Sequence, residues 1–503
     1  MSTTSTKKIK NGTSHKINGW TYISIKGSPK ERGYAYGYLI AEDFKKIQEM
    51  LQFNIYNEFG KTWDFFIEAG KNALKDTIVK QFPEIYEEME GVAMGCSAAG
   101  TKTTIDEILA WNNYFTLLDS WYGSESTATG SREGGASDRC SAFIAVGDYT
   151  EDGKIVVAHN SFSNFVDGQY MYCILDINPS KGHRILMQTC PGWIWSGTDF
   201  FVTSKGILGT ETTIGGFNVY ENNYTIACRI RKAMQYGDTL DDYERILLDG
   251  NSGDYANSWL FGDTNTNEIM RIELGLKYHN TERTKNGYFV GFNSAYDPRI
   301  RNLECNNSGF DDIRRHQGAR RVRLTDLMDE HKGKINIDMA LKIIADHYDV
   351  YLHKENKCSR TICSHYDLDG REYMSQADRP KPYAPRGALD GCAADSKMIK
   401  DMSFMARWGS SCGTPFSTAE FCDKNRQWNY LKPFLNDRPS QPWTRFTITE
   451  SSASAPDSGS VLRSDTRSAR LHPLNFTNTT KTRNHRLKQK IRKIGKKIFS
   501  RKK

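Results

Sequence analysis

The chain has 503 residues, 38% of them hydrophobic and 12% aromatic, which is enough apolar material for a large buried core. It contains no run of 18 or more apolar residues, so the pattern excludes a membrane-spanning helix. Twelve Lys and Arg residues lie within 481–503, and without them the net charge of +8 becomes −4 (+8 minus 12), so the body is mildly acidic and the tail is basic.

The first 18 residues are polar and show no hydrophobic period, so the sequence predicts that residues 1–18 are disordered. They include basic residues but no apolar stretch, so no secretory signal peptide is predicted and the localisation stays unknown. Residues 19–30 alternate as a strand does, and helical spacing then runs to residue 119. We therefore expect a largely helical segment over 19–121. Its small residues, in IYEEMEGVAMGCSAAG, predict helices that approach closely.

The composition changes abruptly at Cys140. Residues 122–139, YGSESTATGSREGGASDR, are small and polar and predict an exposed linker. Two strand-like runs follow, CSAFIAVG and KIVVAHNSF, with a turn signal between them, so the pattern predicts a hairpin that starts at Cys140. A self-cleaving N-terminal-nucleophile hydrolase needs such a cysteine, because the α-amine freed by cleavage can act as a base. The alternative is a buried structural cysteine, which is the commoner role.

The remaining pattern predicts a core over residues 140–449. Short strands separated by turns continue to about residue 300, and helices return at 318–348. This order favours an α+β fold, a four-layer αββα sandwich in which an antiparallel double sheet lies between helical layers. Residues 450–503 are rich in Ser and Thr and then basic, and they predict disorder.

The basic end of the chain has a pattern of its own. Leu487, Ile491, Ile494 and Ile498 form one apolar stripe on a helix whose other faces are Lys and Arg. Such a segment, 481–503, can lie on an anionic membrane or contact the phosphates of a nucleic acid. A solvated tail is the alternative, and the sequence leaves the oligomeric state open.

The eleven cysteines are scattered, odd in number and contain no C-x-x-C pair. This spacing argues against a zinc site and against a dense disulfide framework, so the sequence predicts neither a metal nor a cofactor. Two pairings are left open for an oxidising compartment: Cys358 with Cys363, and Cys412 with Cys422.

Several blocks occur in one order along the chain: CSAFIA, AHNSFSNF, SGTDFFVTSKGILGTETTIGGFN, NSGDYANSW, GYFVGFNSAYDPRI, RGALDGCAADSKM and GSSCGTPF. Together they resemble the phospholipase B-like family and, more distantly, the acyl-CoA:6-aminopenicillanic-acid acyltransferase and choloylglycine hydrolase families. The resemblance covers roughly residues 20–445. It implies an N-terminal-nucleophile hydrolase fold, acylated lipid or amide substrates, and a family that is usually lysosomal or secreted.

The resemblance also implies roles for single residues. Cys140 would be the nucleophile, first in cleavage of the Arg139–Cys140 bond and then toward substrate. His159 would orient groups or transfer a proton, and Asn293 would help to hold the tetrahedral oxyanion. The alternatives are a half-buried structural histidine and an asparagine at the end of a strand.

Other residues are expected to line or support the pocket. Glu211 and Thr213 lie on a strand that leads toward the same place, and a buried Glu211 needs a partner such as Arg320 or Arg323. A charge on the surface of a helix is the alternative for both arginines. Weaker candidates are Asn251, Asn257 and Asp390.

These residues favour a self-processing cysteine hydrolase that removes acyl groups from phospholipids. An amidase of the same fold, acting on N-acyl amides or peptides, is the alternative, since the fold alone does not choose the substrate. The hypothesis from another class is an inactive protein that associates with a membrane or a nucleic acid through its tail. Cleavage before Cys140 would separate the enzyme from the inactive protein.

Overall fold

The computed structural model describes residues 6–123, 139–306, 309–370 and 382–448. They all belong to the first of two compact units, Met1–Thr449, and the second unit is Glu450–Lys503. The predicted disordered tail with its amphipathic stripe, and nearly all of the predicted linker 122–139, lie outside the described residues.

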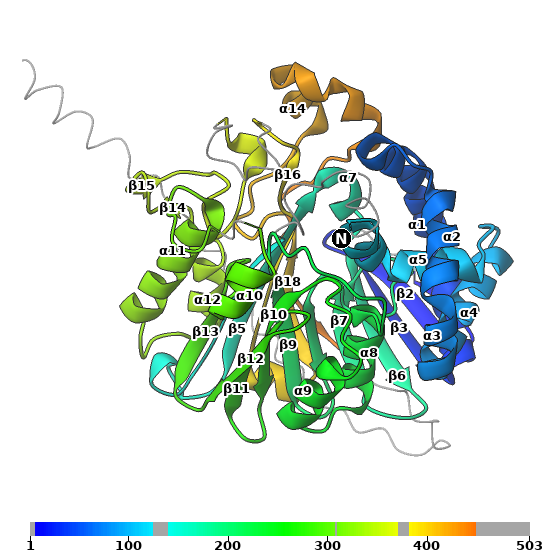
Figure 1. The fold of residues 1–503 in the computed structure, drawn as a ribbon, viewed down its shortest axis with the longest axis horizontal. Helices are drawn as coiled ribbons and strands as arrows, with labels where there is room; N and C mark the ends of the chain where they lie inside the picture. The colour runs from blue at the N-terminus through cyan, green and yellow to red at the C-terminus, as the bar shows by residue number, and fades with distance from the viewer. Residues whose placement is uncertain (1–5, 124–138, 307–308, 371–381, 449–503) are drawn as a thin grey trace, which may run out of the picture. The chain divides into compact units, whose positions relative to one another are not determined.

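Two large sheets form the centre of the structure (Figure 1). The ten-stranded sheet has the order β1 (Lys7–Ile9), β2 (Gly12–Ile17), β3 (Trp20–Gly27), β6 (Cys173–Pro179), β7 (Ile185–Thr189), β8 (Phe200–Thr203), β9 (Ile207–Thr213), β10 (Asn257–Asp263), β11 (Glu268–Leu274) and β12 (His279–Thr284). The seven-stranded sheet has the order β13 (Gly287–Gly291), β4 (Cys140–Val146), β5 (Val156–Asn164), β17 (Asp390–Asp395), β18 (Ser403–Trp408) and β19 (Thr444–Thr447), with β16 (Arg386–Ala388) paired to β5. A separate small pair joins β14 (Tyr348–Asp349) and β15 (Lys354–Glu355).

The helices fall before, between and after these strands. The α-helices are α1 (Pro29–Phe59), α2 (Trp63–Ala73), α3 (Lys75–Gln81), α4 (Pro83–Ala98), α5 (Ile105–Asn112), α7 (Phe165–Gly168), α8 (Ile226–Tyr236), α9 (Leu240–Leu248), α10 (Pro298–Leu303), α11 (His316–Glu330), α12 (Ile337–Ile343), α13 (Ser396–Lys400) and α14 (Thr418–Lys424). A π-helical turn, η1 (Thr116–Trp121), and the 3₁₀ segments η2 (Gly147–Tyr149), η3 (Tyr366–Leu368) and η5 (Arg426–Phe434) complete the set. None of the described helices combines the length and apolar character needed to cross a membrane.

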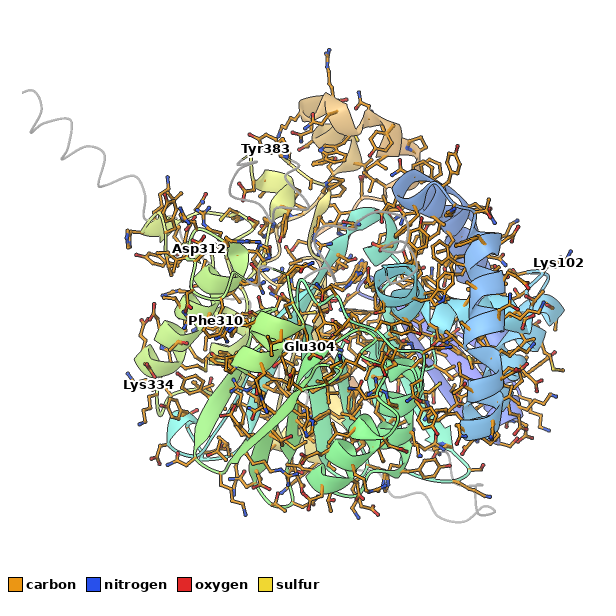
Figure 2. The ribbon with its side chains drawn as sticks, in the orientation of Figure 1. Lys102, Glu304, Phe310, Asp312, Lys334 and Tyr383 are labelled. Atoms are coloured by element: carbon orange, nitrogen blue, oxygen red, sulfur yellow. The ribbon has the colours of Figure 1, made fainter. Side chains whose placement is uncertain are left out.

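The two faces of β4 pack against different layers of the structure. Ala142 and Ile144 point into the core shared with the ten-stranded sheet, whereas Phe143 packs into a second core with Leu324 of α11 and Ile343 of α12. On its other side the ten-stranded sheet is covered by helices, including α1 and α9. Side chains fill the space between the ribbons (Figure 2). The order is therefore helices, sheet, sheet, helices, as expected for the mixed α+β class.

The prediction of disorder over residues 1–18 is wrong for the residues that the structure describes there. Strands β1 and β2 form a hairpin in which Lys7 pairs with Ser14, and β2 pairs along β3. The turn has Asn11 at a φ of 66°, directly before Gly12, where an added Cβ atom would lie 2.9 Å from side-chain atoms of Ala35 and Leu39 of α1. The two turn residues are Lys10 and Asn11, and Asn tolerates the positive φ of this position, but the polar composition around it concealed the turn signal.

The close approach of helices predicted from the small residues of IYEEMEGVAMGCSAAG is confirmed, because a Cβ atom added to Gly91 or Gly95 of α4 would lie 2.5 or 2.1 Å from a backbone oxygen of α1. Gly33 and Gly37 of α1 face α4, and a Cβ atom added to either would lie 2.1 or 2.0 Å from a backbone oxygen of α4. Two helix backbones can approach this closely only where glycine, which has no side chain, lies at the contact. The segment is part of the main body, because its strand β3 pairs in parallel with β6.

Candidate active site

Cys140 is the first residue of β4, and its side chain is completely buried. The hairpin places Ala142 opposite His159 of β5, so the cysteine and the histidine lie on neighbouring strands, as expected. The Cys140 sulfur lies 3.7 Å from Oδ2 of Asp199. The ligand-type atoms of Cys140, His159 and Asp199 are all within 4.8 Å of one another. A thiol, an imidazole and a carboxyl group therefore converge at the start of β4.

The peptide bond before Cys140 is held at both ends. The carbonyl oxygen of Arg139 accepts a hydrogen bond from the backbone N–H of Phe162. The N–H of Cys140 donates to Oδ1 of Asn293 over 3.2 Å. These two contacts fix the plane of the bond that self-cleavage would break.

Asn293 lies in this site but does not have the expected orientation. Its Oδ1 also accepts a hydrogen bond from Arg320 (2.8 Å), and its Nδ2 donates to the carbonyl oxygen of Thr213 (2.7 Å). Two donors on Oδ1 and one acceptor on Nδ2 define the orientation of the amide. In the described state Asn293 therefore positions the Cys140 nitrogen and does not point a donor at an oxyanion. Thr213 contributes its backbone carbonyl, and its hydroxyl is buried without a hydrogen bond.

Arg320 belongs to the site and Arg323 does not. The Arg320 guanidinium donates to the carbonyl oxygen of Cys140 and to Oγ of Ser141, the latter over 3.0 Å. Arg323 instead pairs with Asp346, at 3.0 and 2.6 Å. Both side chains start from α11, but they point in different directions.

The carboxyl group of Glu211 is buried beside Asp199, so the expected pairing of Glu211 with Arg320 or Arg323 is not formed. Burial and the Asp199 charge raise the pKa of Glu211 well above its usual value. Burial raises the pKa of Asp199 to about 6, although Tyr255 donates a hydrogen bond to Oδ2 over 3.2 Å. Two acids this close cannot both ionise freely, so they share protons.

The thiol and the imidazole are both neutral in this surrounding. Burial, followed by the charges of Asp199 and Glu211, raises the pKa of the Cys140 thiol well above its usual value. Burial lowers the pKa of His159 to about 3, and neither ring nitrogen has a hydrogen-bond partner. With its pKa lowered to about 3, His159 is a weak base, so Asp199 is the stronger proton acceptor within reach of the sulfur.

The side chain of Arg139 is buried as well. Its guanidinium pairs with Asp119 at 2.7 Å, donates to Oγ of Ser163 at 3.3 Å and lies 4.3 Å from the centre of the Phe115 ring. The charge of Asp119 outweighs desolvation and raises the pKa of Arg139. The residue before the candidate cleavage bond, Arg139, is therefore held between an acidic and an aromatic side chain.

The weaker candidates divide into three cases. Asp390 is buried next to β5, where it accepts hydrogen bonds from the N–H of Ser161 (2.9 Å) and from Gln188 (2.6 Å). Asn251 supports a turn by donating to the carbonyl oxygen of Gly275. Asn257 is buried opposite Thr213, and its amide has no hydrogen-bond partner.

Sequence reasoning missed Asp199 and Tyr255, although both lie in blocks that carried the resemblance. Both have a positive φ, 71° for Asp199 and 45° for Tyr255, as does Asn293 at 65°. A backbone of this kind is costly for residues other than glycine and clusters at functional sites. The usable signal in the sequence was an acid directly before the apolar strand FFVT.

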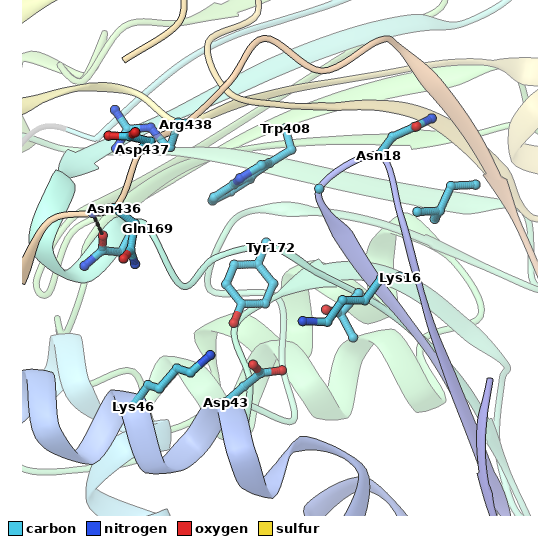
Figure 3. Close-up of a pocket in the computed structure, with 13 residues that line it drawn as sticks. Lys16, Asn18, Asp43, Lys46, Gln169, Tyr172, Trp408, Asn436, Asp437 and Arg438 are labelled. Atoms are coloured by element: carbon cyan, nitrogen blue, oxygen red, sulfur yellow. Dashed lines mark hydrogen bonds between the residues drawn. The ribbon is translucent and has the colours of Figure 1, made fainter. Parts of the chain in front are cut away.

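A large surface pocket lies elsewhere. It has a volume of about 410 Å³ and is lined by residues such as Asp43, Lys46, Tyr172 and Trp408 (Figure 3). None of Cys140, His159 and Asp199 lines it. This pocket is therefore separate from the buried cluster of Cys140, His159 and Asp199.

Comparisons with known proteins find one family model and several relatives of low identity. The sequence model of the family Phospholipase B matches residues 31–274. The chain is 26% identical to "Phospholipase B" of Crotalus adamanteus over 293 residues, 52% of this chain and 49% of that protein. It is 24% identical to human "Phospholipase B-like 1" over 354 residues, 62% of this chain and 60% of that protein. An "Uncharacterized protein" of Archaeoglobus fulgidus is 24% identical over 47% of this chain and 40% of that protein.

Fold and site thus define a mixed α+β protein with a buried thiol, imidazole and carboxyl cluster at the start of a central strand. The chain is similar over residues 31–274 to the phospholipase B family, and the relatives named above are distant homologues. It spans about half the length of the curated relatives it matches. A mutant conjugated bile acid hydrolase from Clostridium perfringens shares 9% identity at a TM-score of 0.33, over 53% of this chain and 89% of that one. At that score the likeness carries no conclusion.

Proposed function

We propose that this chain is a self-processing cysteine hydrolase of the N-terminal-nucleophile type, and that it cleaves acyl ester or amide bonds. The geometry of the Arg139–Cys140 peptide carries the proposal. The Phe162 N–H contacts its carbonyl oxygen, Asn293 accepts its N–H, and the Cys140 sulfur is beside Asp199. The helix, sheet, sheet, helix order is the architecture expected of this class of enzyme and supports the assignment.

Self-processing begins when the Cys140 sulfur attacks the carbonyl carbon of Arg139. The carbonyl oxygen becomes an oxyanion next to the Phe162 N–H, a donor of the kind that lowers such barriers by about 3 kcal/mol. The thiol proton passes to Asp199 and then to the departing nitrogen, and the C–N bond breaks. Water hydrolyses the resulting thioester, which restores the thiol and leaves a carboxylate on Arg139.

The same residues then serve substrate hydrolysis. The new α-amine of Cys140 remains next to Oδ1 of Asn293, which orients it. The Arg320 guanidinium, bonded to the same Oδ1, disfavours a second positive charge there and keeps the amine in its basic, neutral form. The amine takes the thiol proton and passes it to the departing alcohol or amine as the C–O or C–N bond breaks. The acyl group stays on the sulfur as a thioester, and water hydrolyses it to the free acid and restores the thiol.

The family name favours acyl groups of phospholipids as substrates. A second candidate, an amide with a basic residue on its acyl side, is favoured by the position that Arg139 occupies. Asp119 contacts the Arg139 guanidinium there, and the Phe115 ring packs under it. The Phe115 ring can pack against either substrate, whereas the Asp119 carboxylate favours a substrate that carries a cation.

Intact masses of the wild type, Cys140→Ala and Cys422→Ala test the proposal. Cys422 is a matched control, because it is equally buried and lies on α14. We expect two fragments, one beginning with Cys140, in the wild type and in Cys422→Ala, and one uncut chain in Cys140→Ala. An uncut chain in all three would contradict the proposal. Fatty acid release from phosphatidylcholine vesicles, compared with cleavage of arginine amides, then separates the two substrate classes.

A further inference from the structure

A second group of metal-ligand side chains lies in loops beside the seven-stranded sheet. His347, Cys363, His365 and Cys412 each offer one ligand atom, and the four atoms lie within 4.8 Å of one another. Cys363 and His365 come from the loop before η3, His347 directly precedes β14, and Cys412 follows β18. We propose that these four residues bind a zinc ion, a site that is separate from Cys140 and goes beyond the proposed function.

The donor set and its spacing fit zinc. Two thiols and two imidazoles are the ligands of Cys₂His₂ structural zinc sites, with Zn–S of about 2.3 Å and Zn–N of about 2.0–2.1 Å. In a tetrahedron these bond lengths place sulfur and nitrogen about 3.5 Å apart. Nε2 of His365 lies 3.5 Å from the Cys363 sulfur and 3.4 Å from the Cys412 sulfur. Both sulfurs therefore already lie at the separation from the His365 nitrogen that a shared tetrahedral ion requires.

The surroundings of the ligands also suit a metal. Nδ1 of His365, the nitrogen away from the two sulfurs, lies 3.6 Å from Oδ1 of Asp367, and a carboxylate in this position orients a metal-bound histidine. The Cys412 sulfur accepts a hydrogen bond from the Thr414 N–H (3.4 Å) and contacts the hydroxyls of Ser410 (3.2 Å) and Thr414 (3.0 Å). Donors of this kind stabilise a thiolate, which is the form that zinc needs. Four protein ligands leave no open position, so the site is structural.

Such an ion would join three loops behind the candidate active site. Asn160, next to His159 on β5, donates through Nδ2 to the carbonyl oxygens of Ile344 and Ile362 and to Oγ of Ser411. Each of these partners lies within three residues of a proposed ligand. Cys363 and Cys412 also pack with Phe162, whose N–H contacts the Arg139 carbonyl. Zinc would therefore hold the loops that support the Phe162 side of the hairpin.

Metal analysis of the full-length protein tests the site. We expect about one zinc per chain in the wild type, no zinc in Cys363→Ser or Cys412→Ser, and unchanged zinc in Cys422→Ser and Cys140→Ser. Zinc lost only in Cys140→Ser would assign the ion to the Cys140, His159 and Asp199 group and overturn the proposal. Absence of zinc from the wild type, with a mass lower by two hydrogens and no free thiol at 363 and 412, would replace it with a disulfide.

A second measurement on the wild type covers the case in which a serine variant does not fold. Alkylation of the native protein, read by peptide mass, should spare Cys363 and Cys412 until a chelator is added. Cys305, which is half-buried and outside the cluster, reports on general unfolding. Replacement of zinc by Co²⁺ should produce thiolate-to-cobalt charge-transfer absorption. Alkylation that does not depend on the chelator, together with no such absorption, would overturn the proposal.

Discussion

Two clusters of cysteine, histidine and carboxyl groups flank the seven-stranded sheet, and their surroundings are opposite. Around Cys140 the charges of Asp199 and Glu211 oppose a thiolate. Around Cys412 they are hydrogen-bond donors and two imidazoles, which favour one. The same residue types can thus be arranged to keep a thiol protonated, as at Cys140, or to favour the thiolate that binds a metal, as at Cys412.

Asp199→Asn should have the largest effect on the Cys140 cluster. It removes the carboxylate nearest the sulfur, so we expect self-processing to slow by about 100-fold or more. Because burial raises the pKa of Asp199 to about 6, wild-type processing should accelerate as the pH rises through that value. The rate is measured from the fraction of cut chain over time at several pH values. If the variant kept both the rate and its pH dependence, Asp199 would not be the proton acceptor.

Arg320→Ala should lower stability as well as processing. The guanidinium satisfies the Cys140 carbonyl, Ser141 and Asn293, and its loss leaves buried acceptors without a donor, at a cost of about 3 kcal/mol. Arg323→Ala is the matched control on the same helix. Its partly exposed pair with Asp346 contributes about 0.5 kcal/mol, and it should process normally. Urea unfolding and intact mass measure both variants, and equal losses in the two would remove Arg320 from the site.

Asp390→Asn should change the pH dependence of stability, and of the three substitutions it should affect self-processing least. Burial raises the pKa of Asp390 from 3.8 to about 7, so the folded state holds its proton more tightly than the unfolded chain. The stabilisation is complete below pH about 4 and is lost as the pH rises from there to about 7, a change of about 4 kcal/mol. Asp390→Asn, in a Cys140→Ala background, should flatten this slope in urea unfolding. Equal slopes with and without the substitution would show that other acids, such as Glu211, dominate.

Local patterns predicted the start of the site and long-range contacts completed it. The break in composition before Cys140 and the turn after its strand predicted the hairpin, which set His159 opposite β4. The acid before FFVT could have marked Asp199 as a candidate, but no local pattern reports that it would lie beside the sulfur, because a loop of irregular backbone brings it there. The Cys₂His₂ group was missed for the same reason. The C-x-x-C pattern detects only cysteines that are close together in the sequence, whereas Cys363 and Cys412 belong to loops that are far apart in it.

The pairing of β3 with β6 has a consequence for the processed protein. The strands before the cleavage bond occupy one side of the ten-stranded sheet, and β3 is hydrogen-bonded to a strand that follows the bond. A cut before Cys140 would change the connectivity of the chain but would leave every one of these hydrogen bonds intact. The two pieces would then behave as one folding unit, stay together on dilution, and separate only when the sheet itself unfolds.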